Sequence, residues 1–243
     1  MLSVTVHALW GVREESPAQL ATRWVRFLRS LAEMDELGPA AWRAAESEGD
    51  MTAPPVELEV AAVAEYLELT NPEPDAPYIG YTSSLWAGQL ETVNAVVGIN
   101  AGGSANRVSD SCVVKLRSTG SADSAELLRR SADVLVALAE CWDADWGEAY
   151  VPDEYRAVKA EFGLRASTPR GGRSVYLSPG RAARAPEGLP GTYVRTDAGG
   201  LVIDLTRGGT QTPAVETVVE ANRQLFAAGA LEPLAVPFDR DRF

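Results

Sequence analysis

Apolar and polar residues alternate at the start of the chain, over residues 4–10. A period of two is typical of a β-strand with one face on the core, so we expect Val4, Val6, Ala8 and Trp10 to be buried. The sequence Ser16-Pro17-Ala18-Gln19 then has the capping signature of a helix start. Apolar residues recur every three or four positions after it, which predicts an amphipathic helix that lies on a sheet.

The rest of the chain repeats both periods. Residues 60–67 predict a second helix, which ends at the proline-rich stretch 71–77. Residues 78–86 and 90–99 are strand-like and are joined by a short turn that contains Gly88. The remaining predicted elements are strands at 111–116, 146–151, 174–177, 193–195 and 201–206, and helices up to Trp142, over 153–162 and from Thr212.

Strands joined by short turns, with helices between groups of strands, favour an antiparallel sheet. We therefore predict the α+β class: a single domain over residues 1–243, with a mainly antiparallel sheet and helices packed on one face. Its length is sufficient for a sizeable core without metals or disulfides. We find neither an internal repeat nor a linker that would divide the chain.

The overall charge is negative, with 34 acidic and 22 basic residues and a formal net charge of −12. Nucleic acids and anionic membranes attract clustered lysine and arginine, so neither is an expected partner. The first ten residues lack the pattern of a signal peptide, and the longest uncharged stretch is too short and polar to cross a bilayer. We expect a cytoplasmic protein whose partner is basic.

Few residues are suited to metal binding or nucleophilic catalysis. The sequence has one histidine, His7, and two widely spaced cysteines, Cys112 and Cys141. Zinc sites built from thiols and imidazoles are therefore excluded, and a catalytic serine or cysteine would have only His7 as a base. The glycine-containing stretch 100–106 lacks the spacing of a phosphate-binding loop, and we interpret it as a flexible connection.

The negative charge is concentrated in two stretches. Residues 33–75 contain 12 acidic residues and one basic residue, Arg43, and residues 140–154 contain six carboxylates and no cation. Around the predicted second helix, the acidic residues include Glu57, Glu59, Glu65 and Glu68.

Carboxylates and tryptophans are interleaved in Trp142-Asp143-Ala144-Asp145-Trp146-Gly147-Glu148. The three carboxylates Asp143, Asp145 and Glu148 could hold a divalent cation or act as acids in a hydrolase, although the spacing of a calcium-binding loop is absent. They could also be solvated residues of a turn beside core tryptophans. A fourth interpretation is an acidic and aromatic patch that recognises another protein.

At this point the chain resembles the immunity protein 52 family, the antitoxin partners in bacterial polymorphic toxin systems. The resemblance extends over roughly residues 4–233, and Ala144 stands where the family pattern leads us to expect proline. The matching positions are Trp10, Arg13-Glu14-Glu15-Ser16, Gly80-Tyr81, Leu85-Trp86, Gly88, Gly98, Asn106, Val108, Trp142-Asp143, Asp145-Trp146 and Tyr176-Leu177-Ser178.

The resemblance implies binding without catalysis, and it brings neither catalytic residues nor a metal or cofactor. The expected partner is a cognate secreted toxin, nuclease-like, with a basic active-site surface. On this interpretation the carboxylates take the place of phosphates at that surface, and we expect them to face the toxin. The residues expected there are Asp143, Asp145, Glu148, Glu57, Glu59, Glu65 and Glu68. The alternative left open is a small-molecule hydrolase or metal-dependent enzyme that uses Asp143, Asp145 and Glu148.

Overall fold

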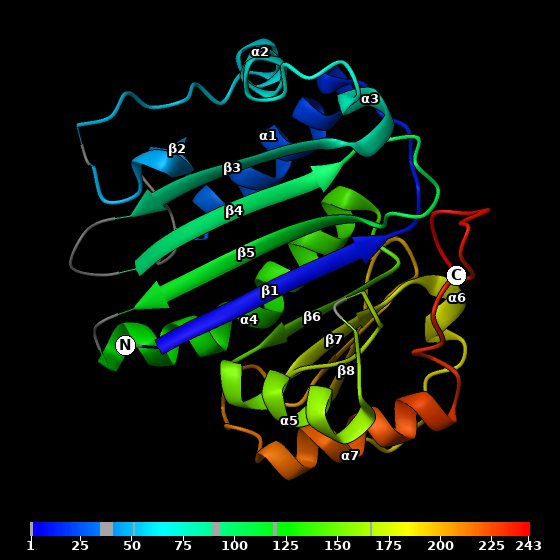
Figure 1. The fold of residues 1–243 in the computed structure, drawn as a ribbon. Helices are drawn as coiled ribbons and strands as arrows, with labels where there is room; N and C mark the ends of the chain where they lie inside the picture. The colour runs from blue at the N-terminus through cyan, green and yellow to red at the C-terminus, as the bar shows by residue number, and fades with distance from the viewer. Residues whose placement is uncertain (1, 35–40, 51, 89–92, 119–120, 166) are drawn as a thin grey trace.

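The computed structural model describes residues 2–34, 41–50, 52–88, 93–118, 121–165 and 167–243. These residues build a nine-stranded sheet in the order β2-β3-β4-β5-β1-β6-β7-β9-β8, in which every pair of neighbours is antiparallel (Figure 1). The prediction of an α+β chain with a mainly antiparallel sheet is confirmed. The strands are β1 (Leu2–Trp10), β2 (Arg43–Ala44), β3 (Tyr81–Gly88), β4 (Val93–Ala101), β5 (Asp110–Ser118), β6 (Trp146–Tyr150), β7 (Ser174–Leu177), β8 (Thr192–Arg195) and β9 (Leu201–Asp204).

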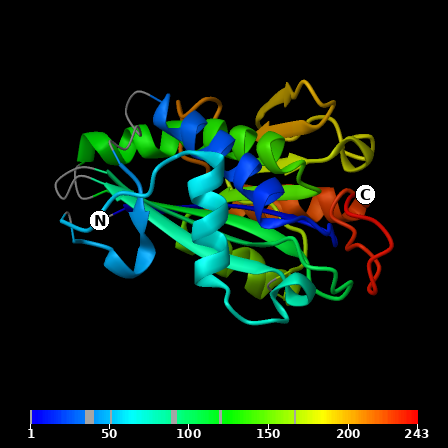
Figure 2. The same cartoon turned by 90° about the horizontal axis from the view of Figure 1, so that it is seen from above.

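Helices lie on both faces of this sheet, and this corrects the expectation that they would pack on one face. The pairs α1 with α4 and α1 with α2 pack together over the face formed by β3, β4, β5 and β1, whereas α5 and α7 pack together on the opposite face beyond β6 (Figures 1 and 2). The helices are α1 (Pro17–Ala32), α2 (Val60–Thr70), α3 (Ala76–Ile79), α4 (Ser121–Trp142), α5 (Pro152–Phe162), α6 (Pro179–Ala182) and α7 (Val215–Ala227), with a 3₁₀ turn at Ala45–Ser47.

The two helical layers create two hydrophobic cores on opposite faces of the sheet. Tyr176 in β7 and Val202 in β9 belong to the core beneath α1 and α4. Their neighbours Val175 and Ile203 point the other way, into the core beneath α5 and α7. The strands β7 and β9 are therefore buried on both faces, while the outer face of β3, β4 and β5 has no helix over it (Figure 1).

Strand β1 lies in the middle of the sheet and joins its two halves. It pairs with β5 from Leu2 to Trp10 and with β6 over Thr5–Leu9. The side chains that the alternation predicted to be buried, at positions 4, 6, 8 and 10, are at most 1% exposed. Long-range pairing with strands more than 100 residues away thus fixes the orientation of the first strand.

The capping signature at the first helix is confirmed. The Ser16 hydroxyl accepts the backbone N–H of Gln19, and the Gln19 side chain accepts the backbone N–H of Ser16. Helix α1 starts at Pro17 as expected.

The strand predicted over residues 78–86 starts three residues later than expected. Residues 76–79 form the single helical turn α3, with Pro77 in its first turn. Gly80 follows with φ of +101°, a conformation that side chains disfavour, and β3 begins at Tyr81. The turn predicted at residues 87–89 begins later, because Ala87 and Gly88 still belong to β3, and Gln89 lies outside the described residues.

The stretch 100–106, interpreted from sequence as a flexible connection, packs closely against α3 and the start of α1. The backbone N–H of Ala105 donates to the Tyr78 carbonyl, and that of Glu15 donates to the Gly102 carbonyl. A Cβ atom on Gly103 would lie 2.5 Å from the backbone nitrogen of Gly80. The glycines therefore allow a close backbone contact that holds α3 in place.

Helix α2 packs beside β3, and its axis crosses the direction of that strand (Figures 1 and 2). The Asn71 amide donates to the Thr82 carbonyl and accepts the Thr82 N–H, and the Tyr66 hydroxyl donates to the Ser84 carbonyl. These side chains satisfy edge groups that β2 does not reach, so the edge does not offer a template for another strand.

Asp110, at the start of β5, accepts the indole N–H of the buried Trp10 at 3.1 Å. Burial raises the pKa of Asp110 to about 7, against the opposing effect of hydrogen bonds from Gly102 and Trp10. Between the ordinary carboxyl pKa and pH 7, the folded protein therefore binds a proton that the unfolded chain does not.

We expect the unfolding free energy of the wild type, relative to Asp110→Asn, to rise by about 1–3 kcal/mol between pH 8 and pH 5. The amide keeps an acceptor for Trp10 but does not titrate. Urea denaturation of both proteins across this range measures the difference. A difference that is independent of pH would contradict a raised pKa at Asp110.

Candidate functional site

The segment that follows α4 carries the interleaved tryptophans and carboxylates. Trp142 stacks on Trp10 with ring centroids 5.4 Å apart, inside the core beneath α1 and α4. Asp143 adopts φ of +47°, and this left-handed residue turns the chain from α4 into β6. Trp146 then lies against His7 on the opposite face of the sheet. The two tryptophans thus serve different sides of the sheet.

Asp145 is buried beneath α6. Its carboxylate pairs with Arg181 at 2.7 Å, and the side chains of Asp145 and Arg181 are 1% and 0% exposed. It also accepts the Ser178 hydroxyl at 3.1 Å and the backbone N–H of Phe243 at 2.7 Å. This carboxylate therefore joins β6, α6 and the C-terminal segment.

Glu148 is buried on the α5 side of the sheet, where it pairs with Arg170 at 2.8 Å. Burial raises the pKa of Glu148 to about 7, although Arg170 favours its charged form. His7 lies opposite Glu148 in the sheet register, and burial together with the charge of Arg170 lowers the pKa of His7 to about 3. His7 is thus neutral at physiological pH and poorly suited to act as a base.

A third buried pair lies close to this one. Glu154, in the first turn of α5, bonds to Arg173 at 2.7 Å, and its side chain also accepts the backbone N–H of Val151. Both charged groups are buried. The predicted acidic stretch 140–154 therefore supplies three carboxylates to ion pairs inside the protein.

Asp143 is more accessible, because 41% of its side chain is exposed, and Asp153 in the same stretch is 75% exposed. It pairs with Arg23 of α1 at 2.8 Å. Although partial burial opposes ionisation, the Arg23 guanidinium holds the pKa of Asp143 below its usual range. Arg23 reaches the end of α4 from the same face of α1 as Arg26, which donates to the Cys141 carbonyl.

The expectation that Asp145 and Glu148 face a partner is corrected by this geometry. Both are 1% exposed, because desolvated carboxylates require buried cations and Arg181 and Arg170 provide them. Asp143, Asp145 and Glu148 each pair with a different arginine and do not form a common site for an enzyme. Within the described residues, no group of three or more Asp, Glu, His or Cys side chains is placed to hold a metal ion.

Ala144, which departs from the expected proline, has a structural role of its own. Its backbone N–H donates to the Ala139 carbonyl at 3.0 Å and closes the end of α4. A proline would remove this donor and would disfavour the left-handed conformation of Asp143. Alanine therefore suits the turn in this chain.

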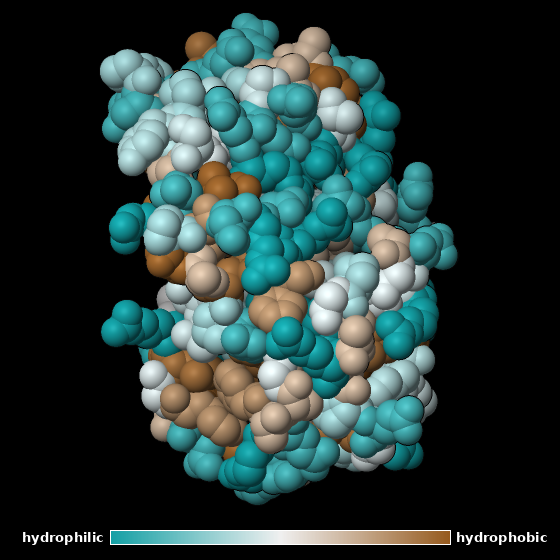
Figure 3. Space-filling view, turned by 90° about the vertical axis from the view of Figure 1, so that its right-hand side faces the viewer, coloured by the Kyte–Doolittle hydropathy of each residue, from teal (hydrophilic) through white to brown (hydrophobic). Residues whose placement is uncertain are grey.

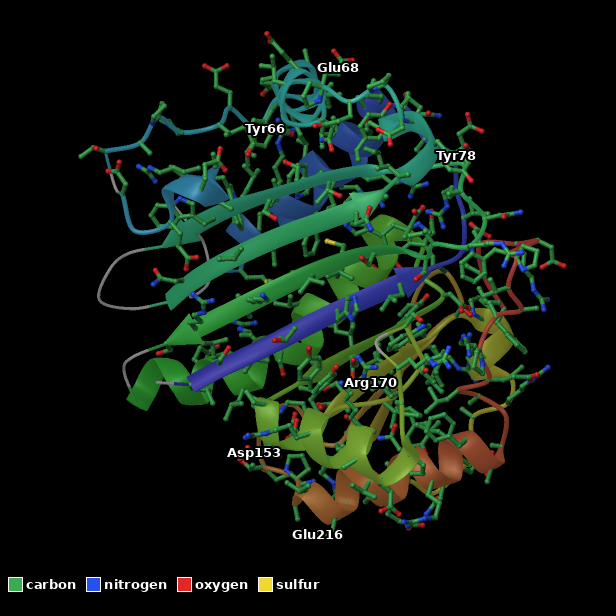
Figure 4. The ribbon with its side chains drawn as sticks, in the orientation of Figure 1. Tyr66, Glu68, Tyr78, Asp153, Arg170 and Glu216 are labelled. Carbon is green, nitrogen blue, oxygen red and sulfur yellow. The ribbon has the colours of Figure 1, made fainter. Side chains whose placement is uncertain are left out.

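The glutamates around α2 are placed differently. Glu57, Glu59, Glu65 and Glu68 are all exposed, on or just before α2 at the top of the molecule as drawn (Figure 4). Glu59 pairs with Arg29 of α1 at 3.1 Å, an exposed contact of little net strength. In the described part of the chain, Glu65 and Glu68 have no cationic partner. The structure thus leaves these carboxylates available at the surface.

Sequence analysis did not identify three exposed apolar side chains beside this acidic surface. Leu69 at the end of α2 is 72% exposed, and Tyr78 and Ile79 of α3 are 62% and 51% exposed. The side of the molecule that includes α3 and the C-terminus shows small hydrophobic areas separated by hydrophilic ones (Figure 3). Pro77 near the start of the helical turn and Gly80 at its end were the sequence signals for this turn, which carries Tyr78 and Ile79.

A second candidate surface is the uncovered face of β3, β4 and β5. A hollow of about 270 Å³ lies there, lined by small or polar residues, two valines and one isoleucine. Such a composition is that of an antiparallel sheet face in contact with water. The lining residues are Ser84, Val96, Gly98, Ile99, Asn100, Ser111, Val113 and Lys115.

The architecture defines an α+β protein built on one antiparallel sheet, and comparison with solved structures finds the same fold in the Pseudomonas aeruginosa T6SS protein PA0821. The two share 10% sequence identity with a TM-score of 0.53, over 95% of this chain and 73% of that chain. The family model of immunity protein 52 matches residues 4–234. The chain therefore belongs to the immunity protein 52 family, as the sequence resemblance predicted, and this family implies a toxin partner.

Two further findings concern related proteins and the helices. No curated protein matches the sequence. Among the described residues, none of the helices has the length and apolar character needed to cross a membrane.

Replacing Asp145 by Asn should lower the unfolding free energy by about 3–5 kcal/mol, because Arg181 is left charged and buried without its partner. The double variant Asp145→Asn, Arg181→Met should recover part of this loss by removing the unpaired charge. Urea denaturation of the wild type, both single variants and the double variant gives the coupling. If the double variant were less stable by the sum of the single losses, the pair would not be coupled.

Proposed function

We propose that this protein is an antitoxin that binds and neutralises a cognate secreted toxin of a polymorphic toxin system. Membership of the immunity protein 52 family supports a toxin partner. The observation that carries the mode of binding is the exposed acidic surface formed by Glu57, Glu59, Glu65 and Glu68. In this proposal the protein protects its own cell in the cytoplasm during competition between bacteria, without catalysis or a cofactor.

The charge of α2 favours a basic toxin surface. A concentrated negative field accelerates encounter with a positively charged partner and disfavours nucleic acids and anionic membranes. Nuclease-like toxins have basic active-site surfaces because they bind phosphates, and carboxylates of the antitoxin would occupy the positions of those phosphates. We infer a nuclease-like toxin on this ground. A stable interface of this kind buries about 1,200–2,000 Å².

The two acidic stretches contribute unequally to this proposal. Asp145 and Glu148 are excluded from the binding surface by their burial. Asp143 remains a candidate at its rim, although Arg23 already neutralises much of its charge. The glutamates of α2 therefore carry the proposal, and no observation favours the alternative of an enzyme that uses Asp143, Asp145 and Glu148.

Expression of the toxin encoded beside this gene should prevent growth of a host cell, and co-expression of this protein should restore growth. Colony counts over a range of induction levels measure the protection. An unrelated acidic protein of similar size controls for nonspecific effects of charge. Equal killing with and without this protein would contradict the antitoxin proposal.

Reversing two charges with Glu65→Lys and Glu68→Lys should slow association with the toxin by about tenfold or more and weaken its dependence on salt. Stopped-flow or surface-binding kinetics at several salt concentrations measure both quantities. Neither glutamate has a cationic partner to lose, so the thermal stability should change little.

Glu187→Lys and Glu216→Lys provide a control of equal charge. Both residues are exposed, and Glu216 lies in α7 at the opposite end of the molecule from α2 (Figure 4). The control should leave the association rate within about twofold of the wild type at moderate salt, because the added charges lie more than a Debye length from the proposed interface. Equal slowing by both pairs would mean that net charge, and not the α2 surface, determines association.

A further inference from the structure

Four of the eight large apolar side chains that are exposed in the described residues fall within residues 60–79. Leu69, Tyr78 and Ile79 are each more than half exposed. Single exposed apolar residues are common on protein surfaces, but a group of them beside one another marks a binding surface. We name Leu69, Tyr78 and Ile79 the apolar cluster.

Hydrogen bonds tie the end of α2, which carries Leu69, to the start of β3, which directly follows α3. Asn71, two residues after Leu69, bonds to the backbone of Thr82, three residues after Ile79. Burial, together with the nearby negative charge of Glu68, raises the pKa of Tyr81. The end of α2 thus lies against the start of β3, and Glu68 and Tyr78 share the upper part of the molecule (Figure 4).

The backbone beneath Tyr78 and Ile79 is held firmly. The carbonyls of Pro77 and Tyr78 accept the N–H groups of Ser104 and Ala105, at 3.2 and 2.9 Å. The close contact between Gly103 and Gly80 leaves no room for a side chain there. The side chains of Tyr78 and Ile79 are therefore exposed on a rigid turn, so that little backbone conformational entropy is lost when a partner binds.

The surroundings of the cluster are negatively charged. Residues 57–75 contain six carboxylates and no lysine or arginine. Glu68 precedes Leu69 in α2, and Asp75 begins the turn that leads to Tyr78. An apolar centre with an acidic rim is complementary to a partner surface whose apolar residues are flanked by lysine or arginine.

We propose that the apolar cluster is the energetic centre of the toxin interface and receives an arginine- or lysine-bearing surface of the toxin. Tyr78 offers its ring to apolar contacts and to a guanidinium or ammonium group, and its hydroxyl to a hydrogen bond. Leu69 and Ile79 exclude water around it. This inference rests on the proposed antitoxin function, and it assigns the strength of binding to these residues and the speed of encounter to the glutamates.

The experiment compares Tyr78→Ala and Ile79→Ser with the controls Val194→Ala and Val194→Ser, which change an exposed residue of β8. The probe is the toxin encoded beside this gene, produced together with this protein and then separated from it. We expect Tyr78→Ala to raise the Kd for the toxin by about 30-fold or more through faster dissociation. Ile79→Ser should also raise the Kd. The salt dependence of association and the thermal unfolding temperature should remain those of the wild type.

Three results would overturn the inference. Unchanged dissociation in both α3 variants, while wild type binds the toxin, would place the centre of the interface elsewhere and leave the antitoxin function intact. Equal weakening by the β8 controls would remove any special role of the cluster. Loss of self-association in Tyr78→Ala, measured by analytical ultracentrifugation without toxin, would show that a second copy of this chain occupies the cluster. Failure of the wild type itself to bind would count instead against the proposed function.

Discussion

Pairing between carboxylates and arginines is the interaction on which this structure depends most. Asp145, Glu148 and Glu154 follow α4 in the acidic part of the chain, and their partners Arg181, Arg170 and Arg173 come from the more basic part that follows residue 161. Because these charges are buried, each carboxylate requires its arginine, and each arginine requires its carboxylate. The uneven distribution of charge along the sequence is thus partly a record of contacts between residues 145–154 and residues 170–181.

This pairing also separates the acidic residues into two groups with different roles. The buried carboxylates Asp145, Glu148 and Glu154 join β6 and α5 to the segments around β7 and α6, and arginines neutralise their charges within the protein. The glutamates on or just before α2 lie over the sheet edge, and within the part of the chain that the structure describes only Glu59 of the four has an arginine partner. Their field therefore extends into solvent, where it attracts a basic partner. Beside them, the turn α3 presents apolar side chains on a backbone fixed by the 100–106 loop.

The local elements of the fold were predictable from sequence, and the long-range contacts were not. Ser16 and Gln19 fix the start of α1 through bonds between close neighbours, and the alternation over β1 correctly gives its buried face. The burial of Asp145 depends on Arg181, and nothing within a few residues of either one indicates this pair. Tyr78 and Ile79 are residue types that favour strands, so the short turn between Pro77 and Gly80 was assigned to a strand.

The predicted α2 glutamates are exposed as the proposed site requires, whereas Asp145 and Glu148 are not. The difference has a physical reason, because residues near the middle of a sheet are covered by later segments of the chain and residues over an edge strand are not. Charge alone does not distinguish these two situations in a sequence. Family membership gave the class of partner, and the geometry gave the surface on which the proposal rests.

Hydrogen–deuterium exchange of the protein with and without its toxin tests the account most directly. The account predicts protection by the toxin over residues 57–79, with the exchange of residues 144–149 unchanged because that segment is already buried. Protection confined to the uncovered face of β4 and β5, with residues 57–79 unaffected, would contradict it.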